Sequence, residues 1–212
     1  MDVSPPRVEA VADEIGAEGV VADVSAQEGV DKILSVAGAR VDVLANVAGI
    51  MDGFLPAHEV DDQTWDHVLA VNLTGPLRLT RAVLPSMMAA GKGAIVNVAS
   101  EAALRGSAAG VAYTASKHGL VGLTRSTAVL YAESGVRCNA VCPGAVATNI
   151  EAASRSDFGM GVIGKYFSNI PTVATPERLA ATICSGAGSG IGLAVAQSPL
   201  SRRCPRPVGD AG

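Results

Sequence analysis

Residues 93–117 read GAIVNVASEAALRGSAAGVAYTASK, a short apolar run that leads into an alanine-rich segment. Gly93 to Ser100 has the Val, Ile and Ala content of a buried strand, and Ala112 to Glu133 continues as a long helix. Tyr113 and Lys117 lie four residues apart on that helix, so their side chains leave the same face. An ammonium group beside a phenol favours the phenolate, which an isolated tyrosine forms only around its ordinary pKa of about 10. The pair therefore indicates proton transfer, although by itself such a pair is also typical of a solvated helix surface.

Outside this segment, short apolar runs alternate with longer helical segments, which is the order of repeated strand–helix–strand units. Pro76 and Pro85 predict a kink or an early end in one long helix over residues 63–90. Residues 151–172 show no clear period, and we expect them to form a mobile excursion. The other predicted strands cover residues 19–23, 41–46 and 136–142, and the other predicted helices cover residues 5–15, 26–36 and 176–182. The sequence thus predicts a single α/β domain with a doubly wound parallel sheet.

Composition and charge argue against several classes of function. Apolar residues make up 49% of the chain and aromatic residues 3%, which suits parallel strands packed under alanine-rich helices. The net charge of -4 and the pI of about 5.3 argue against a nucleic-acid partner. No apolar run is long enough to span a bilayer, the first residues have no secretory character, and the cysteines and histidines lack metal-ligand spacing. We therefore expect a soluble cytoplasmic protein without a metal.

Three further motifs accompany the tyrosine and lysine. Asn46-Val47-Ala48-Gly49 follows a predicted strand, Asn72 lies within the long helix, and Pro143-Gly144 ends another strand. Together with Tyr113-x-x-x-Lys117 these motifs closely resemble the short-chain dehydrogenase/reductase family, over about residues 2–183. The resemblance implies a Rossmann-like fold and an enzyme that transfers a hydride between a nicotinamide cofactor and a secondary alcohol or ketone.

The resemblance also implies a catalytic tetrad of Asn72, Ser100, Tyr113 and Lys117. Tyr113 would be the general acid/base at the substrate oxygen, and Ser100 would hold and polarise that oxygen. Lys117 would lower the pKa of Tyr113 and hydrogen-bond the nicotinamide ribose. Asn72 would hold a water that relays the proton outward.

Cofactor contacts follow from the same resemblance. An acid at the end of the second strand, here Asp2, would bind the adenosine ribose hydroxyls and repel a 2′-phosphate, which favours NAD over NADP. The alternative interpretation is that Asp2 is a disordered terminal residue without a role in binding. The remaining implied cofactor residues are Asp23 and Val24 at the adenine, Asn46, Ala48 and Gly49 at the adenosine side, Tyr113 and Lys117 at the ribose, and Pro143, Gly144 and Thr148 at the carboxamide.

The glycine motif that binds the pyrophosphate in the family is displaced in this chain. Members start with a strand and a Gly-x-x-x-Gly-x-Gly turn, whereas here that motif lies at Ser185 to Gly192, near the other terminus. Gly186 would allow the tight turn, while Gly190 and Ile191 would stand where the phosphate approaches. Either the protein is circularly permuted, with Ala180 to Cys184 as the central strand, or the reading frame joins pieces of one gene or of two neighbouring genes. The spacing favours misjoining, because nine residues from Pro176 to Cys184 barely hold a helical turn and a strand.

This organisation divides the chain into three parts: a Rossmann-type domain without its first strand over residues 1–183, the displaced glycine loop and helix start over 184–197, and an irregular tail over 198–212. The first hypothesis is an NAD-dependent oxidoreductase that acts on a small alcohol or carbonyl compound and forms a homodimer or homotetramer. The alternative is a catalytically inactive, truncated or misjoined remnant, which would act at most as an oligomerisation or nucleotide-binding module.

Overall fold

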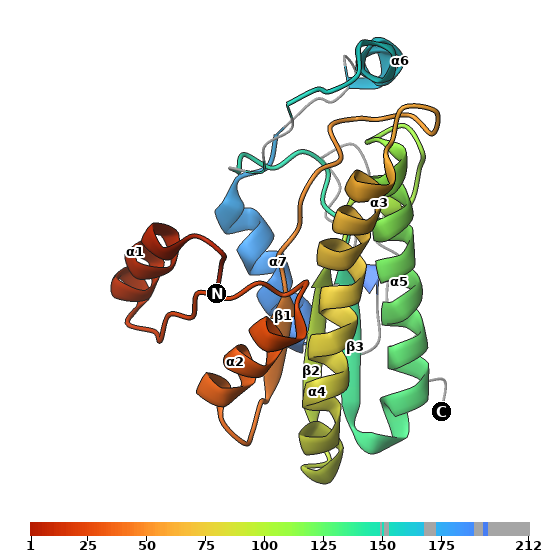
Figure 1. The fold of residues 1–212 in the computed structure, drawn as a ribbon. Helices are drawn as coiled ribbons and strands as arrows, with labels where there is room; N and C mark the ends of the chain where they lie inside the picture. Colours follow the sequence, from red (N-terminus) through yellow and green to blue (C-terminus); the bar gives the residue numbers. More distant parts are fainter. Residues whose placement is uncertain (149, 151–152, 168–172, 189–192, 195–212) are drawn as a thin grey trace, which may run out of the picture.

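The computed structural model describes residues 1–148, 150, 153–167, 173–188 and 193–194. Its centre is a parallel sheet in the order β1-β2-β3-β4, formed by Val43–Asn46, Gly93–Val98, Val136–Val141 and Leu193–Ala194. All six residues of β2 are buried, as expected for a parallel strand covered on both faces. The α/β fold with a parallel sheet is therefore confirmed (Figure 1).

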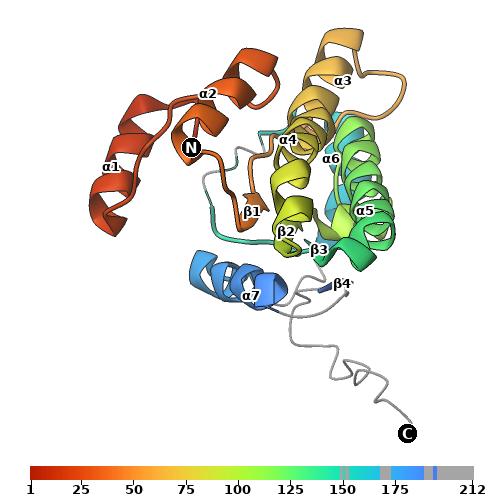
Figure 2. The ribbon, with the colours of Figure 1, turned by 90° about the horizontal axis from the view of Figure 1, so that it is seen from below.

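Helices cover both faces of this sheet. The helices α4 (Gly75–Ala89) and α5 (Val111–Tyr131) lie on one face, and α7 (Pro176–Gly188) lies on the other (Figure 2). In the largest core cluster, which lies between α4 and the sheet, Leu79 and Met87 of α4 pack against Ile95 of β2 and Val136 of β3. Each such fully buried side chain contributes about 1.5–3 kcal/mol to stability.

The long helix predicted over residues 63–90 is interrupted before its first proline. It consists of α3 (Asp62–Leu69), a π-helical turn over Ala70–Thr74, and α4. Pro76 stands in the first turn of α4, where a missing N–H costs little, and Pro85 lies inside that helix. The expected irregularity near Pro76 is thus a π-helical turn, a feature often found at functional sites.

The N-terminal segment forms a lobe beside β1. The predicted helices appear as α1 (Pro5–Ile15) and α2 (Gln27–Ala37). Residues 19–23, predicted as a strand, form a single parallel bridge between Val21 and Asp2. In the part of the chain that the structure describes, no strand pairs with the outer side of β1. Residues 19–23 therefore have no partner strand in the sheet with which to form a longer strand.

The C-terminal predictions need three corrections. Ala180 to Cys184 and Ser185 to Gly188 all belong to α7, so neither a central strand nor the start of a glycine loop forms there. Leu193–Ala194, predicted as the start of a helix, pairs in parallel with Ala140 and Val141 of β3. Thr175 caps the start of α7, since its hydroxyl accepts a hydrogen bond from the Arg178 N–H at 3.5 Å. Gly186 lies against the sheet, where an added Cβ would be 3.8 Å from the Val96 side chain. The central strand of the permutation hypothesis is therefore wrong.

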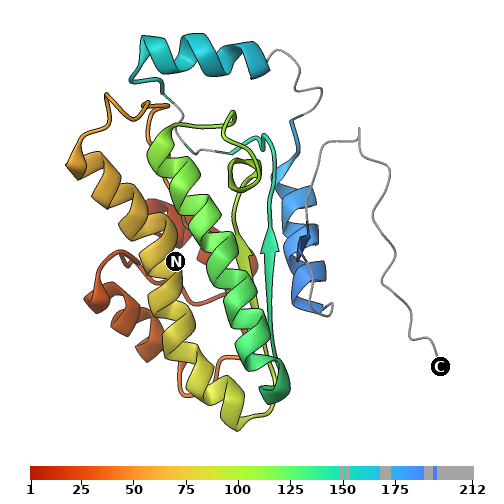
Figure 3. The ribbon, with the colours of Figure 1, turned by 90° about the vertical axis from the view of Figure 1, so that its right-hand side faces the viewer.

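A fourth correction concerns the excursion over residues 151–172. Asp157–Phe167 forms the helix α6, which lies beyond the carboxyl ends of the strands (Figure 3). The Ser156 hydroxyl accepts a hydrogen bond from the Gly159 N–H at 2.8 Å and so caps this helix. Gly190, Ile191 and the tail over residues 198–212 lie outside the described residues, and misjoining of the reading frame stays a prediction.

Candidate active site

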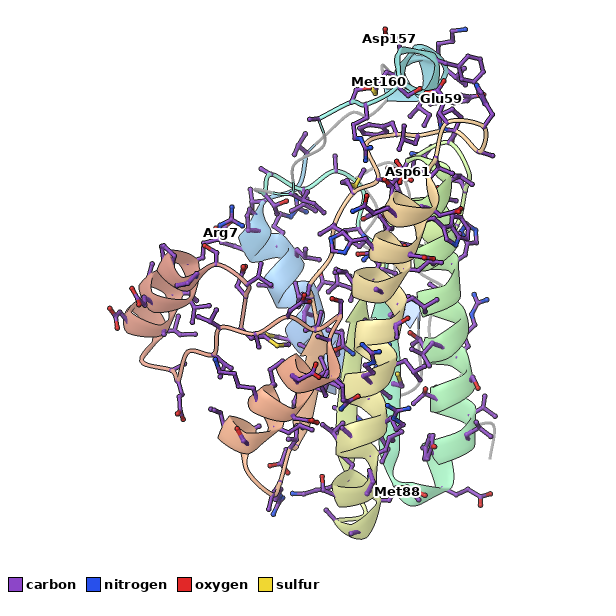
Figure 4. The ribbon with its side chains drawn as sticks, in the orientation of Figure 1. Arg7, Glu59, Asp61, Met88, Asp157 and Met160 are labelled. Atoms are coloured by element: carbon purple, nitrogen blue, oxygen red, sulfur yellow. The ribbon has the colours of Figure 1, made fainter. Side chains whose placement is uncertain are left out.

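The chemistry-bearing side chains meet at the carboxyl ends of the strands. Ser100 follows β2 by two residues and Gly49 follows β1 by three, so both stand at the same edge of the sheet. Figure 4 shows Asp61 at the start of α3 near this end, below Asp157 and Met160 of α6, while Met88 marks the opposite end. Ligand sites in open α/β sheets lie at this edge.

Tyr113 and Ser100 form the centre of the site. Tyr113 is in the first turn of α5 and is 7% exposed, and its side chain is hydrogen-bonded to that of Ser100. The Ser100 hydroxyl also accepts a hydrogen bond from the Ala102 N–H at 3.1 Å, which fixes its place at the start of a short 3-10 helix over Glu101–Ala103. The two hydroxyls therefore lie close enough to share one substrate oxygen.

Burial sets the pKa of Tyr113 in this geometry. Removal from water raises the pKa, the hydrogen bond with Ser100 lowers it, and the negative charge of Asp52 raises it further. The net direction is upward. Lys117, expected to lower the pKa of Tyr113, is not among the groups that shift it, and burial favours the protonated phenol.

Lys117 lies one turn along α5 from Tyr113. Its Nζ is 5.5 Å from the centre of the Tyr113 ring and donates a hydrogen bond to the Val98 carbonyl at 3.0 Å. Burial lowers its pKa to about 8. The amine can therefore gain or lose a proton near neutral pH, which suits a group that passes protons.

Asn72 joins three segments from within the π-helical turn. Its Oδ1 accepts a hydrogen bond from the Ile50 N–H at 2.9 Å, and its Nδ2 donates to the Ile50 carbonyl at 2.9 Å and the Ser116 hydroxyl at 3.1 Å. A Cβ at Gly49 would lie 3.3 Å from Lys117 Nζ and 3.4 Å from Asn72 Oδ1. The absence of a side chain at Gly49 thus lets the amine and the amide face one small space, where one lone pair of Asn72 Oδ1 remains available.

The cofactor residues at the adenosine side only partly fit a nicotinamide dinucleotide. Asn46 Oδ1 is buried without a hydrogen-bond partner, and a small cavity beside it is lined by Val24 and Ala48. An unpaired buried acceptor next to a cavity suits a ligand that donates a hydrogen bond. Asp23 is exposed at the same side, and its pKa is lowered by hydrogen bonds with Ser25.

Other implied cofactor residues are placed as follows. Asp2 forms a parallel bridge with Val21, and its Oδ1 accepts a hydrogen bond from the Ser4 N–H at 2.9 Å. Pro143 follows β3 and accepts a hydrogen bond from the Glu101 N–H at 2.8 Å, so Pro143-Gly144 lies next to Ser100. Thr148 is exposed. These positions are compatible with a ligand that extends along the carboxyl edge of the sheet.

Gly186 does not fit a pyrophosphate contact. It is buried in α7 with its carbonyl oxygen accepting a hydrogen bond from Asn139 Nδ2 at 2.6 Å. Its backbone is therefore used against the sheet and is not presented to a phosphate. Among the described residues, the glycine motif thus contributes no phosphate cradle.

Two buried polar residues were missed by sequence reasoning. Asp52 is 1% exposed and accepts hydrogen bonds from the Phe54 and Tyr113 N–H groups. Asn97 is fully buried in β2 and links Asn46 to Thr124. An acid between the apolar pairs Ile50-Met51 and Phe54-Leu55 was the available signal for Asp52, and an amide inside an otherwise apolar strand was the signal for Asn97.

A parallel sheet with helices on both faces and a Tyr–Ser–Lys–Asn group at its carboxyl edge is the arrangement typical of dinucleotide-dependent oxidoreductases. The family model for short chain dehydrogenases matches residues 1–158. The chain is 40% identical over 204 residues to the short-chain dehydrogenase/reductase olcF of Penicillium canescens, across 89% of this chain and 76% of the relative. It is 51% identical over 139 residues to cdmF of Talaromyces verruculosus, across 65% of this chain and 54% of that protein.

Solved structures agree with this assignment. A protein assigned as an NAD(P)-dependent gluconate 5-dehydrogenase from Beutenbergia cavernae, which carries NADP at low occupancy, has a TM-score of 0.75 and 38% identity, over 89% of this chain and 80% of that one. Levodione reductase has a TM-score of 0.77 and 28% identity, over 92% and 84%. The chain belongs to the short-chain dehydrogenase/reductase family. It spans about half the length of several curated relatives that it matches, such as cdmF.

Proposed function

We propose that the protein transfers a hydride between a nicotinamide cofactor and a secondary alcohol or ketone. The observation that carries this proposal is the buried Tyr113 hydroxyl, hydrogen-bonded to Ser100 and one helical turn from Lys117. A bound nicotinamide ring supplies the hydride. The chain's own task is to hold the substrate oxygen and to move one proton.

Each residue of the tetrad has a role that its surroundings support. In reduction, the Tyr113 hydroxyl donates its proton to the carbonyl oxygen, and the Ser100 hydroxyl holds that oxygen. The raised pKa of Tyr113 favours the protonated phenol, which is the form that a reduction needs. Lys117, with a pKa of about 8, returns the proton, and Asn72 fixes the turn at Ile50 and offers an acceptor to a relay water.

We further propose NAD as the preferred cofactor. Asp2 keeps one carboxylate oxygen beyond the Oδ1 that accepts from Ser4, and a carboxylate binds ribose hydroxyls while it repels a 2′-phosphate. Residues that could hold the cofactor are Asp2, Asp23, Val24, Asn46, Ala48, Gly49, Tyr113, Lys117, Pro143, Gly144 and Thr148.

A second candidate is a protein of the same fold without turnover. The observation that favours it is the placement of Gly186, whose carbonyl is bonded to Asn139 within α7. Because the described part of the glycine motif offers no phosphate cradle, the cofactor would lack there the helix N-terminus that usually binds its pyrophosphate. Such a protein would serve as a nucleotide-binding or oligomerisation module, with α4 and α5 as the helices that pair in a homodimer or homotetramer.

Titration with NADH and NADPH separates these candidates. The fluorescence of each reduced cofactor is followed as protein is added, and turnover is then measured with a panel of cyclic and open-chain ketones. Micromolar binding of NADH with turnover that Tyr113→Phe abolishes supports the oxidoreductase, and tighter binding of NADPH contradicts the proposed preference. Binding without turnover, or no binding, supports the second candidate.

The surroundings in which the protein works are also part of the proposal. Within the residues that the structure describes, no helix is both long and apolar enough to cross a membrane. The net charge of -4 suits a freely diffusing protein that avoids nucleic acid. We propose a cytoplasmic location, which fractionation of cells expressing a tagged chain would test.

A further inference from the structure

Asp52 is a buried carboxylate on the loop that follows β1. It is 1% exposed, and the ion pairs found among the described residues do not include it. Its Oδ1 accepts a hydrogen bond from the Phe54 N–H at 3.1 Å, and its Oδ2 accepts one from the Tyr113 N–H at 2.9 Å. A buried charge is costly unless its oxygens are hydrogen-bonded, so these two N–H groups are what keep the carboxylate there.

The bond to Tyr113 makes Asp52 the cap of α5. The residue before that helix is Gly110, which has no side chain to satisfy the first N–H groups. A Cβ at Gly110 would lie 2.5 Å from each Asp52 carboxylate oxygen, so the carboxylate occupies the space where a local cap would stand. The negative charge also faces the positive end of the helix dipole. A loop far away in sequence thus supplies what Gly110 lacks.

The loop that carries Asp52 is itself held in an unusual backbone. Gly53 has a φ of 69°, and Phe54 has a φ of 61°, a left-handed conformation that costs energy in a residue with a side chain. The Asp52 bond to the Phe54 N–H holds this turn, and the Leu55 carbonyl accepts a second bond from α5, from the Val111 N–H at 2.9 Å. Such strain persists only where the surroundings fix it, and it clusters at active sites.

We propose that Asp52 is a positioning residue for the reaction of Tyr113. Its carboxylate fixes the first turn of α5 and the backbone of Tyr113, so that the phenol points to Ser100, and its charge faces the phenol. This inference rests on the proposed function for its catalytic meaning. The titratable groups near the Tyr113 ring are Asp52 from the loop and Lys117 from α5, and Cys142, the residue after β3, lies in turn near Lys117.

The first test reads Tyr113 directly and needs no turnover. In a Tyr131→Phe/Tyr166→Phe background, Tyr113 is the remaining tyrosine, and its ionisation is followed by the ultraviolet absorbance of the phenolate. Asp52→Asn removes the negative charge that raises the pKa of Tyr113, so the midpoint should move to lower pH. An unchanged midpoint in a folded Asp52→Asn protein overturns the proposal, and it does so whether or not the enzyme is active.

The matched control is Asp61→Asn. Asp61 caps α3 by accepting a hydrogen bond from the Thr64 N–H at 2.6 Å, but it is exposed and is not among the groups that shift Tyr113. Both variants lose one capping charge, and only Asp52→Asn should move the Tyr113 midpoint. Equal shifts in both variants would show a non-specific effect and would also overturn the proposal.

The second test uses activity, if the proposed function holds. Because a small misplacement of a reacting group costs up to about 100-fold in rate, Asp52→Asn should lower kcat about 10- to 100-fold and change KM less than about threefold. Asp52→Glu should recover part of kcat, since it keeps the charge. A fall in thermal stability with unchanged kcat would assign Asp52 a structural role alone. Absence of turnover in the unmodified protein would instead refute the proposed function and leave the titration to decide on Asp52.

Discussion

Asn72 is the residue whose replacement should affect the site and the fold together. In Asn72→Ala, the Ile50 N–H and carbonyl lose their partners at 2.9 Å each. Ser116 loses a donor, but its hydroxyl keeps its own bond to the Tyr113 carbonyl at 2.7 Å. The cost therefore arises mainly at Ile50.

The expected loss of stability follows from these contacts. A buried backbone group left unpaired costs about 1–3 kcal/mol, and Ile50 is only partly buried, so the lower part of that range applies. Two groups together should cost about 2–3 kcal/mol in the free energy of unfolding. Asn72→Asp keeps the acceptor for the Ile50 N–H and loses the two donors, so it should fall between Ala and the unmodified protein.

Urea unfolding followed by circular dichroism measures this loss as a lower midpoint at an unchanged m-value. Gln27→Ala is the control, because Gln27 also uses its amide to donate a hydrogen bond, to Asp31, but on an exposed surface. It should change stability by less than about 0.5 kcal/mol. If Asn72→Ala also loses less than this, the network around Ile50 does not stabilise the protein and the reasoning fails.

Three further predictions follow from single residues. Tyr113→Phe should lower kcat by about 100- to 10,000-fold without weakening NADH binding more than a few-fold, and an active Phe variant would remove Tyr113 from the chemistry. Burial lowers the pKa of Lys117 from 10.5 to about 8, so the unfolded chain holds this proton across that window and the contribution of Lys117 to stability rises with pH there. Lys117→Met should remove that rise in stability. If the free energy of unfolding, measured by urea unfolding, depends on pH equally in the unmodified and variant proteins, the prediction is wrong. Gly135→Ala should destabilise by at least about 2 kcal/mol, because its φ is 74° and a Cβ would lie 2.0 Å from the Gly91 carbonyl oxygen. Gly122 lies on α5 with open space where a Cβ would stand, so Gly122→Ala should stabilise the protein by about 0.5–1 kcal/mol. Similar thermal midpoints for the Gly135→Ala and Gly122→Ala variants would contradict both predictions.

The central part of the fold could be predicted from sequence because each element has one clear period. Residues 93–100 and 136–142 are short, mostly apolar runs, as strands buried in a parallel sheet are, and they appear as β2 and β3. The end of α1 could be predicted because a glycine, Gly16, follows it, and Gly16 indeed adopts a left-handed φ of 63° there.

The errors lie where local patterns compete. Gly159, Gly161 and Gly164 weaken the helical signal of α6, although Ser156 followed by Asp157 was a usable start signal. Leu193–Ala194 is too short to show a period, and its strand exists only through pairing with β3. The alanine-rich end of α7 was open to a strand interpretation because Ala180 to Cys184 suits either state.

The sequence predicts which residues form the site, but not the pKa of Tyr113 or the local backbone around Asn72. Tyr113 and Lys117 share a helix face, which a spacing of four fixes, and Ser100 comes to them through the parallel order of β2 and β3. The direction of the Tyr113 pKa could not be predicted, because it depends on burial and on Asp52, which lies 61 residues away in sequence. The π-helical turn at Asn72 depends likewise on a distant partner, the backbone of Ile50.

The outer side of β1 bears on how the protein behaves at high concentration. Val43 is 54% exposed, and the described residues pair β1 on one side only, with β2. An uncharged strand with free backbone groups is a template on which another extended chain can add. Concentrated stocks should therefore scatter light increasingly with time, and a charged side chain such as Val43→Lys should slow that growth without disturbing the carboxyl edge.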